Sequence, residues 1–144
     1  MPNRQKKDRK SVIVAAVSGG PDSVYLLRKL STEKGTRIVL GHVNYRTRGI
    51  DSEKDQALVE KSGKSFEYNT EILVPDKESS VAGFDVASGN RGNFPAGFEK
   101  KAREIRYRFL RDLSRKSGAE AIALAHTADD QVETILMRVC EAAG

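Results

Sequence analysis

The sequence predicts a doubly wound α/β fold, in which helices cover both faces of a mainly parallel sheet. Short apolar runs of strand length recur along the 144 residues, and segments with helical spacing of apolar side chains separate them. Most of these runs are nearly continuous in apolar residues, as expected for parallel strands that are buried on both faces.

Four strands are expected along the chain. They lie at Val12–Val17, Arg37–Val43, Ser65–Leu73 and Ala121–Ala125. Helices are expected where apolar residues recur every three or four positions. They lie at Ser23–Leu30, Asp51–Gly63, Phe98–Lys116 and Val132–Val139.

One domain is expected over residues 12–144, after a basic, flexible tail at residues 1–11. Between Pro75 and Gly97 the pattern lapses into a long loop, which in a compact domain is either mobile or functional. Little chain follows Cys140, so the strand at Ala121–Ala125 would be left as an open sheet edge. We therefore expect a domain that is incomplete at its C-terminus and is completed by a second copy in a homodimer or by further C-terminal domains.

The composition fits a cytoplasmic protein and narrows its chemistry. No apolar run is long enough to cross a membrane, and the run after the basic N-terminus is too short for a signal peptide. The single cysteine, Cys140, excludes an internal disulfide, a CxxC pair, a zinc knuckle and an iron–sulfur site encoded in this chain. The formal net charge of +5 suits a polyanionic partner without identifying one.

The stretch SGGPDS at residues 18–23 connects the first expected strand to the first helix. Gly19 and Gly20 give backbone freedom and accessible N–H groups, so a helix N-terminus flanked by serine hydroxyls would face an anion. A carboxylate beside phosphates is repulsive unless a cation lies between them, and Asp22 therefore indicates Mg²⁺. The alternative is a structural turn in which Asp22 only complements the helix dipole, an effect worth about 0.3–1 kcal/mol.

Two more stretches bring chemistry-bearing side chains to the same edge of the sheet. His42 in GHVNYRTRG and His126 in ALAHTADDQVET each lie at the carboxyl end of an expected strand, where open α/β sheets bind ligands. Asp129 and Asp130 follow His126 at the start of the next expected helix. These side chains and Asp22 are candidates for one crevice, and the sequence leaves open which of the two neighbouring aspartates acts.

The fourth stretch, EKKAREIRYRFL, predicts a basic helix. Arg106 flanks the apolar stripe and Arg103 lies further round the helix, so both are candidates to reach back across the end of the sheet. Lys100, Lys101 and Arg108 are expected to point to solvent.

Taken together, the four stretches resemble a known family. SGGPDS resembles the PP-loop of the N-type ATP pyrophosphatases, whose domains share an adenine nucleotide alpha hydrolase-like fold. HVNYRTRGIDS, KAREIRYRFL and AHTADDQVETILMR are similar in order and spacing to the N-terminal domain of the tRNA(Ile)-lysidine synthetases, over about Val12 to Arg138.

The resemblance implies an ATP-dependent ligase that uses Mg²⁺. Such enzymes adenylate the C2 carbonyl of the wobble cytidine in an isoleucine tRNA with a CAU anticodon, release pyrophosphate, and then join lysine to form lysidine. The implied contacts to ATP phosphates and magnesium fall on Ser18, Gly19, Gly20, Asp22 and Ser23. The implied catalytic residues are Asp22, Arg106, His126 and Asp130, of which Asp130 is also a magnesium candidate. Arg103 would lie near the nucleotide, and His42, from its place in the strand-end layer, joins the cofactor-binding candidates.

Two departures from the family pattern bear on this interpretation. Tyr45 stands where the family commonly has a second histidine, and Glu141 stands where an arginine is expected. A tRNA thiolation enzyme of the same superfamily is an alternative, against which the missing CxxC pair counts. A truncated nucleotide-binding remnant without turnover is another, and lysine-dependent pyrophosphate release would distinguish the three.

Overall fold

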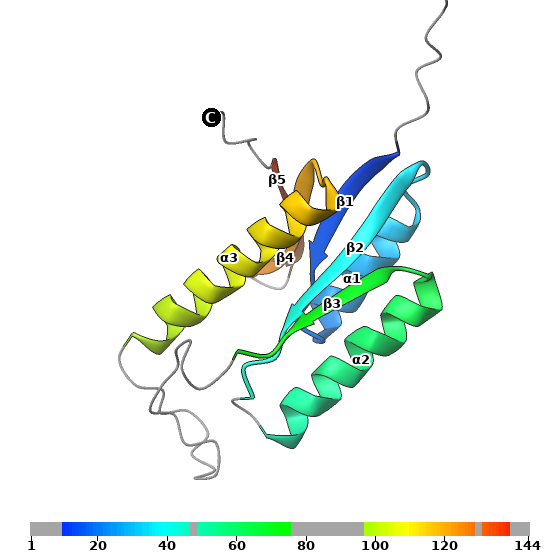
Figure 1. Cartoon of the computed structure of the whole chain (residues 1–144). Coiled ribbons are helices and arrows are strands. Elements are labelled where there is room, and N and C mark those ends of the chain that lie inside the picture. The colour runs from blue at the N-terminus through cyan, green and yellow to red at the C-terminus, as the bar shows by residue number, and fades with distance from the viewer. Residues whose placement is uncertain (1–9, 47–48, 76–96, 129–130, 139–144) are drawn as a thin grey trace, which may run out of the picture.

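The computed structural model describes residues 10–46, 49–75, 97–128 and 131–138 of the chain. Its strands form one sheet of five, in the order β3-β2-β1-β4-β5 (Figure 1). In chain order the elements are β1 (Ser11–Ala16), α1 (Pro21–Ser31), β2 (Thr36–Val43), α2 (Ile50–Phe66), β3 (Asn69–Leu73), α3 (Phe98–Ser117), β4 (Ala121–Ala128) and β5 (Gln131–Arg138).

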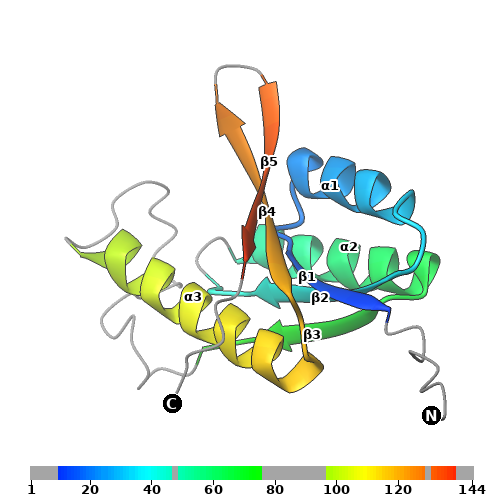
Figure 2. The same cartoon turned by 90° about the horizontal axis from the view of Figure 1, so that it is seen from above.

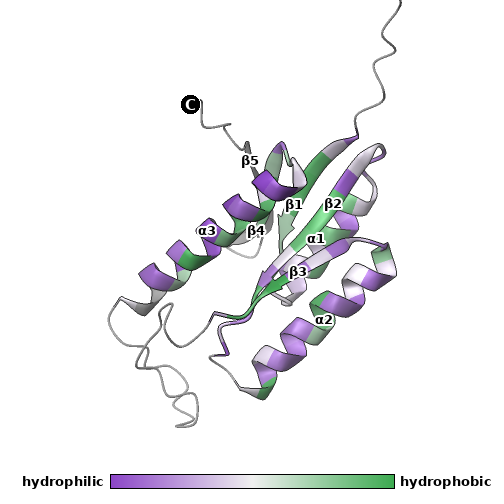
Figure 3. Cartoon of the chain, viewed as in Figure 1, coloured by the Kyte–Doolittle hydropathy of each residue, from purple (hydrophilic) through white to green (hydrophobic). Residues whose placement is uncertain are grey.

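Helices cover both faces of this sheet, because successive strand residues point to opposite sides. On one face, Ala15 of β1 lies in a buried cluster with Leu26 of α1 and Val59 of α2. On the other face, the neighbouring Val14 packs with Leu110 of α3. Figure 2 shows α1 and α2 on one side of the sheet and α3 on the other, and Figure 3 shows apolar residues along β1 between these layers. The doubly wound fold predicted from the sequence is confirmed.

The strand order creates a crevice beside β1. Strands β1 to β4 run parallel, so their carboxyl ends share one edge of the sheet. The chain moves outward from β1 to β3 and then returns through α3 to place β4 on the other side of β1. Ligands in open α/β sheets bind at such a reversal of strand order, outside the carboxyl ends of the strands.

The expected strand at Ser65–Leu73 begins too early. Helix α2 continues through Phe66, Glu67 takes a left-handed φ of 57°, and β3 begins at Asn69. The rings of Phe66 and Tyr68 stack with centroids 5.5 Å apart. The apolar residues that suggested a strand therefore pack across a helix-to-strand turn.

The expected helix over Val132–Val139 is wrong, because Gln131–Arg138 form strand β5, antiparallel to β4. Backbone groups along the edge of β4 need hydrogen-bond partners, and the Val, Thr and Ile residues of this segment favour a strand. The edge of β4 that was expected to lie open is therefore paired with β5, which becomes the outer strand of the sheet. Figure 2 shows the β4–β5 hairpin extending past the end of β1.

Several expectations fall outside the described residues. The basic tail to residue 9, the loop at residues 76–96, Asp129, Asp130 and the segment after Arg138 belong to this group. Among the helices that are described, none combines the length and the apolar character needed to cross a membrane.

Candidate functional site

A cavity of about 410 Å³ lies at the carboxyl edge of the sheet, beside the reversal of strand order. Small-molecule sites in proteins typically enclose roughly 300–1,000 Å³. The walls come from the ends of three strands, the start of α1 and the middle of α3. The lining residues are Ala16, Val17, Ser18, Asp22, Ser23, Gly41, Val43, Tyr45, Arg106, Leu110, Leu124 and Ala125.

Serine hydrogen bonds hold the loop at residues 18–23 against the first turn of α1. The Ser18 N–H donates to Oγ of Ser23 at 2.8 Å, and the two hydroxyl oxygens lie 3.0 Å apart. The Gly20 N–H donates to Oγ of Ser18 at 3.4 Å. Asp22 lies in the first helical turn, where a carboxylate complements the helix dipole. A helix N-terminus with two hydroxyls at its mouth is suited to bind a phosphate.

Gly19 brings this loop into direct contact with α2. It has φ of +87°, a left-handed value that disfavours a side chain. A β-carbon at this position would lie 2.8 Å from both Cβ and the carbonyl oxygen of Asp55 in α2. The glycine is therefore required by both its backbone conformation and the close approach of the helix.

His42 braces the loop from the strand below it. Its Nδ1 lies 2.8 Å from the carbonyl oxygen of Val17, so Nδ1 carries the hydrogen and donates it. The side chain is 4% exposed, and Nε2 is buried without a hydrogen-bond partner among the described residues. His42 lines a second, smaller cavity of about 130 Å³, together with Ser18, Asn44 and Asp55.

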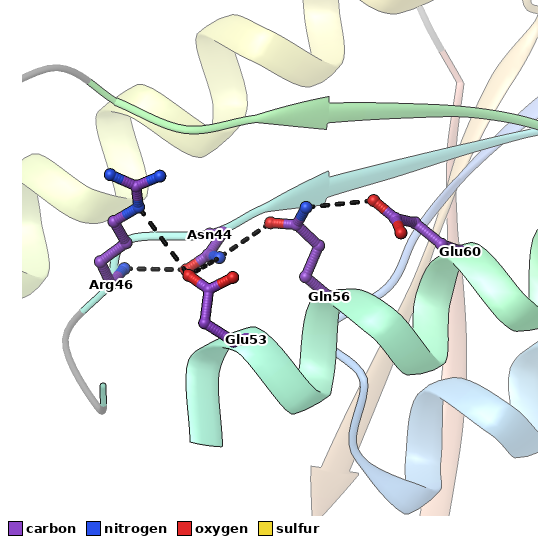
Figure 4. A network of polar contacts seen from close by, with 5 residues as sticks. All are labelled: Asn44, Arg46, Glu53, Gln56 and Glu60. Atoms are coloured by element: carbon purple, nitrogen blue, oxygen red, sulfur yellow. Dashed lines mark hydrogen bonds and ion pairs between the residues drawn. The ribbon is translucent and has the colours of Figure 1, made fainter. Parts of the chain in front are cut away.

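A polar network fixes the chain just after β2 (Figure 4). Asn44 is 2% exposed, and its Nδ2 donates to Gln56 Oε1 at 2.8 Å and to Glu53 Oε1 at 3.4 Å. The Arg46 N–H donates to Oδ1 of Asn44 at 2.9 Å, and Arg46 has a left-handed φ of 55°. Gln56 in turn donates to Glu60 at 3.0 Å. Asn44 thus ties the turn after β2 to α2.

Tyr45 lies between Asn44 and Arg46 in the turn after β2, and its side chain reaches α3. Its hydroxyl donates to the carbonyl oxygen of Ala102 in α3 at 2.7 Å, and its side chain lines both cavities. Burial raises the pKa of Tyr45, and the nearby Arg106 guanidinium offsets part of that rise. The hydroxyl is therefore protonated at neutral pH and remains a donor.

The two candidate arginines flank Tyr107 on α3. The guanidinium carbons of Arg103 and Arg106 lie 5.4 and 5.7 Å from the centroid of the Tyr107 ring, within cation–π range. Arg106 lines the larger cavity, whereas Arg103 lies outside its walls. Only Arg106 therefore faces the loop at residues 18–23 across the cavity.

Comparison of the sequence with models of known protein families shows the family of this chain. The model of the PP-loop domain family matches residues 2–144. The chain belongs to the PP-loop domain family.

Two curated relatives of this PP-loop domain carry the same description. The chain is 36% identical over 140 residues to the tRNA(Ile)-lysidine synthase of Clostridium tetani, a match that covers 92% of this chain and 27% of that protein. It is 33% identical over 133 residues to the protein of the same name from Bacillus subtilis, covering 91% and 26%. The chain thus spans about a quarter of the length of these relatives.

A solved structure shares the fold. The U34-tRNA thiolase NcsA from Methanococcus maripaludis, described with its 4Fe-4S cluster, matches 84% of this chain and 40% of its own, with a TM-score of 0.56 and 19% identity. At this identity the likeness shows a common PP-loop fold and nothing further.

The structure brings four of the candidate residues to one cavity. Ser18, Asp22, Ser23 and Arg106 line it together. The other candidates are placed differently. Gly19 and Gly20 shape the loop, His42 lines the smaller cavity, Arg103 is exposed, and the His126 side chain and Asp130 lie outside the described residues.

Tyr45 and Asn44 are the residues that motif reasoning missed. Their sequence signal is their place at the carboxyl end of β2, beside His42. Side chains alternate between the two faces of the sheet along this segment. The alternate positions Gly41, Val43 and Tyr45 line the larger cavity. Asn44, between them, is directed toward α2.

The PP-loop residues supply part of a magnesium site. Mg²⁺ binds commonly through one or two carboxylates together with phosphate oxygens and water. Asp22 lines the cavity beside two serine hydroxyls, which is a donor set of that kind. Within the described ranges, no group of three or more His, Cys, Asp or Glu side chains forms a metal site, so the nucleotide would have to contribute ligands.

Proposed function

We propose that this chain is the ATP-binding, catalytic part of a tRNA(Ile)-lysidine synthase. The reaction would adenylate the C2 carbonyl of the wobble cytidine in an isoleucine tRNA with a CAU anticodon and then join lysine to that carbon. The proposal rests on one observation: Asp22 and the serines of the PP-loop line the larger cavity together with Arg106. The names of the relatives at 33–36% identity support the choice of tRNA substrate.

The triphosphate would bind at the start of α1. The Ser18 and Ser23 hydroxyls, which lie 3.0 Å apart at the helix N-terminus, would bind phosphate oxygens there together with backbone N–H groups of the loop. Asp22 would hold Mg²⁺, and the bound ion would supply the positive charge that lets a carboxylate lie beside phosphates.

Arg106 would act on the other side of the same cavity. Departure of pyrophosphate develops negative charge on the leaving oxygens, and a cation already positioned there stabilises that charge without reorganisation. Arg106 enters the cavity from α3, whereas the PP-loop enters it from α1. His126 and Asp130, by resemblance to the family, would complete the reaction centre.

The outer face of α3 supports an RNA partner. Five basic side chains are exposed along it with few acids between them, a pattern that suits a phosphate backbone. They are Lys100, Lys101, Arg108, Arg111 and Arg115. Replacing Arg108 and Arg111 together by Glu should weaken tRNA binding at least tenfold and flatten its salt dependence, while replacing Lys61 and Lys64 of α2 by Glu should not.

The test of this function is lysine-dependent pyrophosphate release from ATP, with an isoleucine tRNA carrying a CAU anticodon. The proposal expects release only when ATP, Mg²⁺, lysine and that tRNA are all present. Sulfur incorporation into tRNA instead would support the thiolation alternative, although this chain has one cysteine with which to hold a cluster. Nucleotide binding without any product, when this chain is assayed together with the remaining regions of such a synthase, would show a non-catalytic PP-loop domain.

Because the chain spans about a quarter of its relatives, the full reaction is assigned to this domain together with the remaining regions of such proteins. We further propose that the enzyme acts in the cytoplasm, where ATP, lysine and tRNA are all available.

A further inference from the structure

Tyr45 is held in place from both sides along the chain. The preceding Asn44 is buried and bonded to Gln56 of α2, and the following Arg46 N–H donates back to the Asn44 side chain. These contacts leave the backbone at Tyr45 little freedom. From this backbone the Tyr45 side chain extends to α3, where its hydroxyl meets the carbonyl oxygen of Ala102.

The hydroxyl of Tyr45 meets α3 at the carbonyl that precedes Arg106 by one turn. The hydrogen bond to Ala102 joins residues 57 positions apart in sequence, at 2.7 Å. In an α-helix the carbonyl of residue i accepts the N–H of residue i+4, so the backbone N–H of Arg106 is directed at the same oxygen. The anchor point and the start of the Arg106 side chain are thus adjacent.

Tyr45 and Arg106 also share the wall of the larger cavity. Arg106 is exposed, so a long and flexible side chain must be kept at the cavity rather than in solvent. The Tyr107 ring supports its guanidinium on one side at 5.7 Å, and Tyr45 fixes the helix turn from which it projects.

We propose that Tyr45 is the positioning residue for Arg106: by anchoring Ala102, it holds the first turns of α3 against the turn after β2 and so keeps the arginine at the nucleotide cavity. The role of Arg106 toward a nucleotide rests on the proposed function, whereas the anchoring of α3 does not. A histidine at this position has a shorter side chain and would not reach the same carbonyl with this backbone.

Tyr45→Phe separates the hydrogen bond from the packing of the ring, and Tyr25→Phe is the matched control. Tyr25 lies on the outer face of α1 and is 52% exposed. Amide hydrogen exchange on the whole chain, without nucleotide, measures directly how far the hydrogen bond from Tyr45 to Ala102 stabilises α3. Tyr45→Phe should accelerate exchange of the Arg106 amide about threefold to tenfold, the equivalent of one lost hydrogen bond, and leave Leu113 near its original rate. Unchanged exchange at Arg106, or equal acceleration along the whole of α3, would overturn the anchor.

A double-mutant cycle measures whether Tyr45 affects the affinity for Mg·ATP through Arg106. Tyr45→Phe should weaken Mg·ATP binding several-fold in the wild-type background and less than about twofold in an Arg106→Ala background, because its effect passes through that arginine. Tyr45→His should reproduce the loss rather than restore affinity. An equal loss in both backgrounds would show that Tyr45 acts independently of Arg106. If the wild-type chain fails to bind ATP, the proposed function fails, and the exchange experiment still decides whether Tyr45 anchors α3.

Discussion

Gly19→Ala should destabilise the protein strongly, although it adds one methyl group. The new β-carbon would lie 2.8–2.9 Å from Cβ, Cα and the carbonyl oxygen of Asp55, and two of these atoms are helix backbone that cannot rotate away. The left-handed φ of +87° adds a second cost. We expect about 1–2 kcal/mol from the backbone conformation and about 1–3 kcal/mol from overpacking, hence about 2–5 kcal/mol in total.

Thermal unfolding followed by circular dichroism measures this loss, with Gly20→Ala as the control. At roughly 2–4 °C per kcal/mol for a chain of this size, Tm should fall by roughly 4–20 °C. Gly20 has an ordinary φ of −78°, and among the described residues a β-carbon there would meet Oγ of Ser18 alone, at an ordinary contact distance of 3.6 Å. Its replacement should cost less than about 1 kcal/mol, as the N-cap of α1. Equal Tm values for Gly19→Ala and wild type would refute the close contact between the PP-loop and α2.

Two further predictions concern the core and the response to alkaline pH. Leu26 is 0% exposed, so Leu26→Ala should lower the free energy of unfolding by about 2–5 kcal/mol, whereas Leu58→Ala, at 40% exposure, should change it by about 0.5 kcal/mol or less in urea titrations. The pKa of Tyr45 is raised by burial, so the folded state keeps the phenol proton to higher pH than the unfolded chain does. The free energy of unfolding should therefore fall as pH rises above about 10, the ordinary tyrosine value, and fall less steeply in Tyr45→Phe. An identical alkaline profile in the two proteins would contradict the burial of that hydroxyl.

The parallel sheet could be predicted because the sequence patterns that specify it each span only a few neighbouring residues. The apolar runs of β1 and β2 and the glycines of the PP-loop each specify their own structure within a few residues. The place of Arg106 beside the apolar stripe of α3 was likewise readable from helical spacing, and the structure puts that side chain at the cavity.

The remaining features depend on contacts between distant residues. Tyr45 acquires its position from Ala102, which lies 57 residues further along the chain, and no local pattern marks that pairing. Segment Gln131–Arg138 has apolar spacing compatible with a helix, but pairing with the edge of β4 decides for a strand. His42 was assigned to the correct layer, yet its separation from the larger cavity follows from the alternation of side chains along β2, which motif reasoning did not use.

The binding of Mg·ATP to Asp22→Ala tests the central claim most directly. Asp51→Ala is the control, because Asp51 occupies the same first-turn position in α2 and its ion pair within the described residues is an exposed contact with Lys54 at 4.0 Å. By isothermal titration, we expect Asp22→Ala to weaken Mg·ATP binding by about tenfold or more, or ~1.4 kcal/mol, to leave metal-free ATP binding no weaker, and to shift Tm by only a few degrees, with Asp51→Ala unchanged in all three. Intact Mg·ATP affinity in Asp22→Ala, above all together with a large fall in Tm, would reduce Asp22 to a structural partner of the helix dipole and contradict the assignment of the cavity as a nucleotide site.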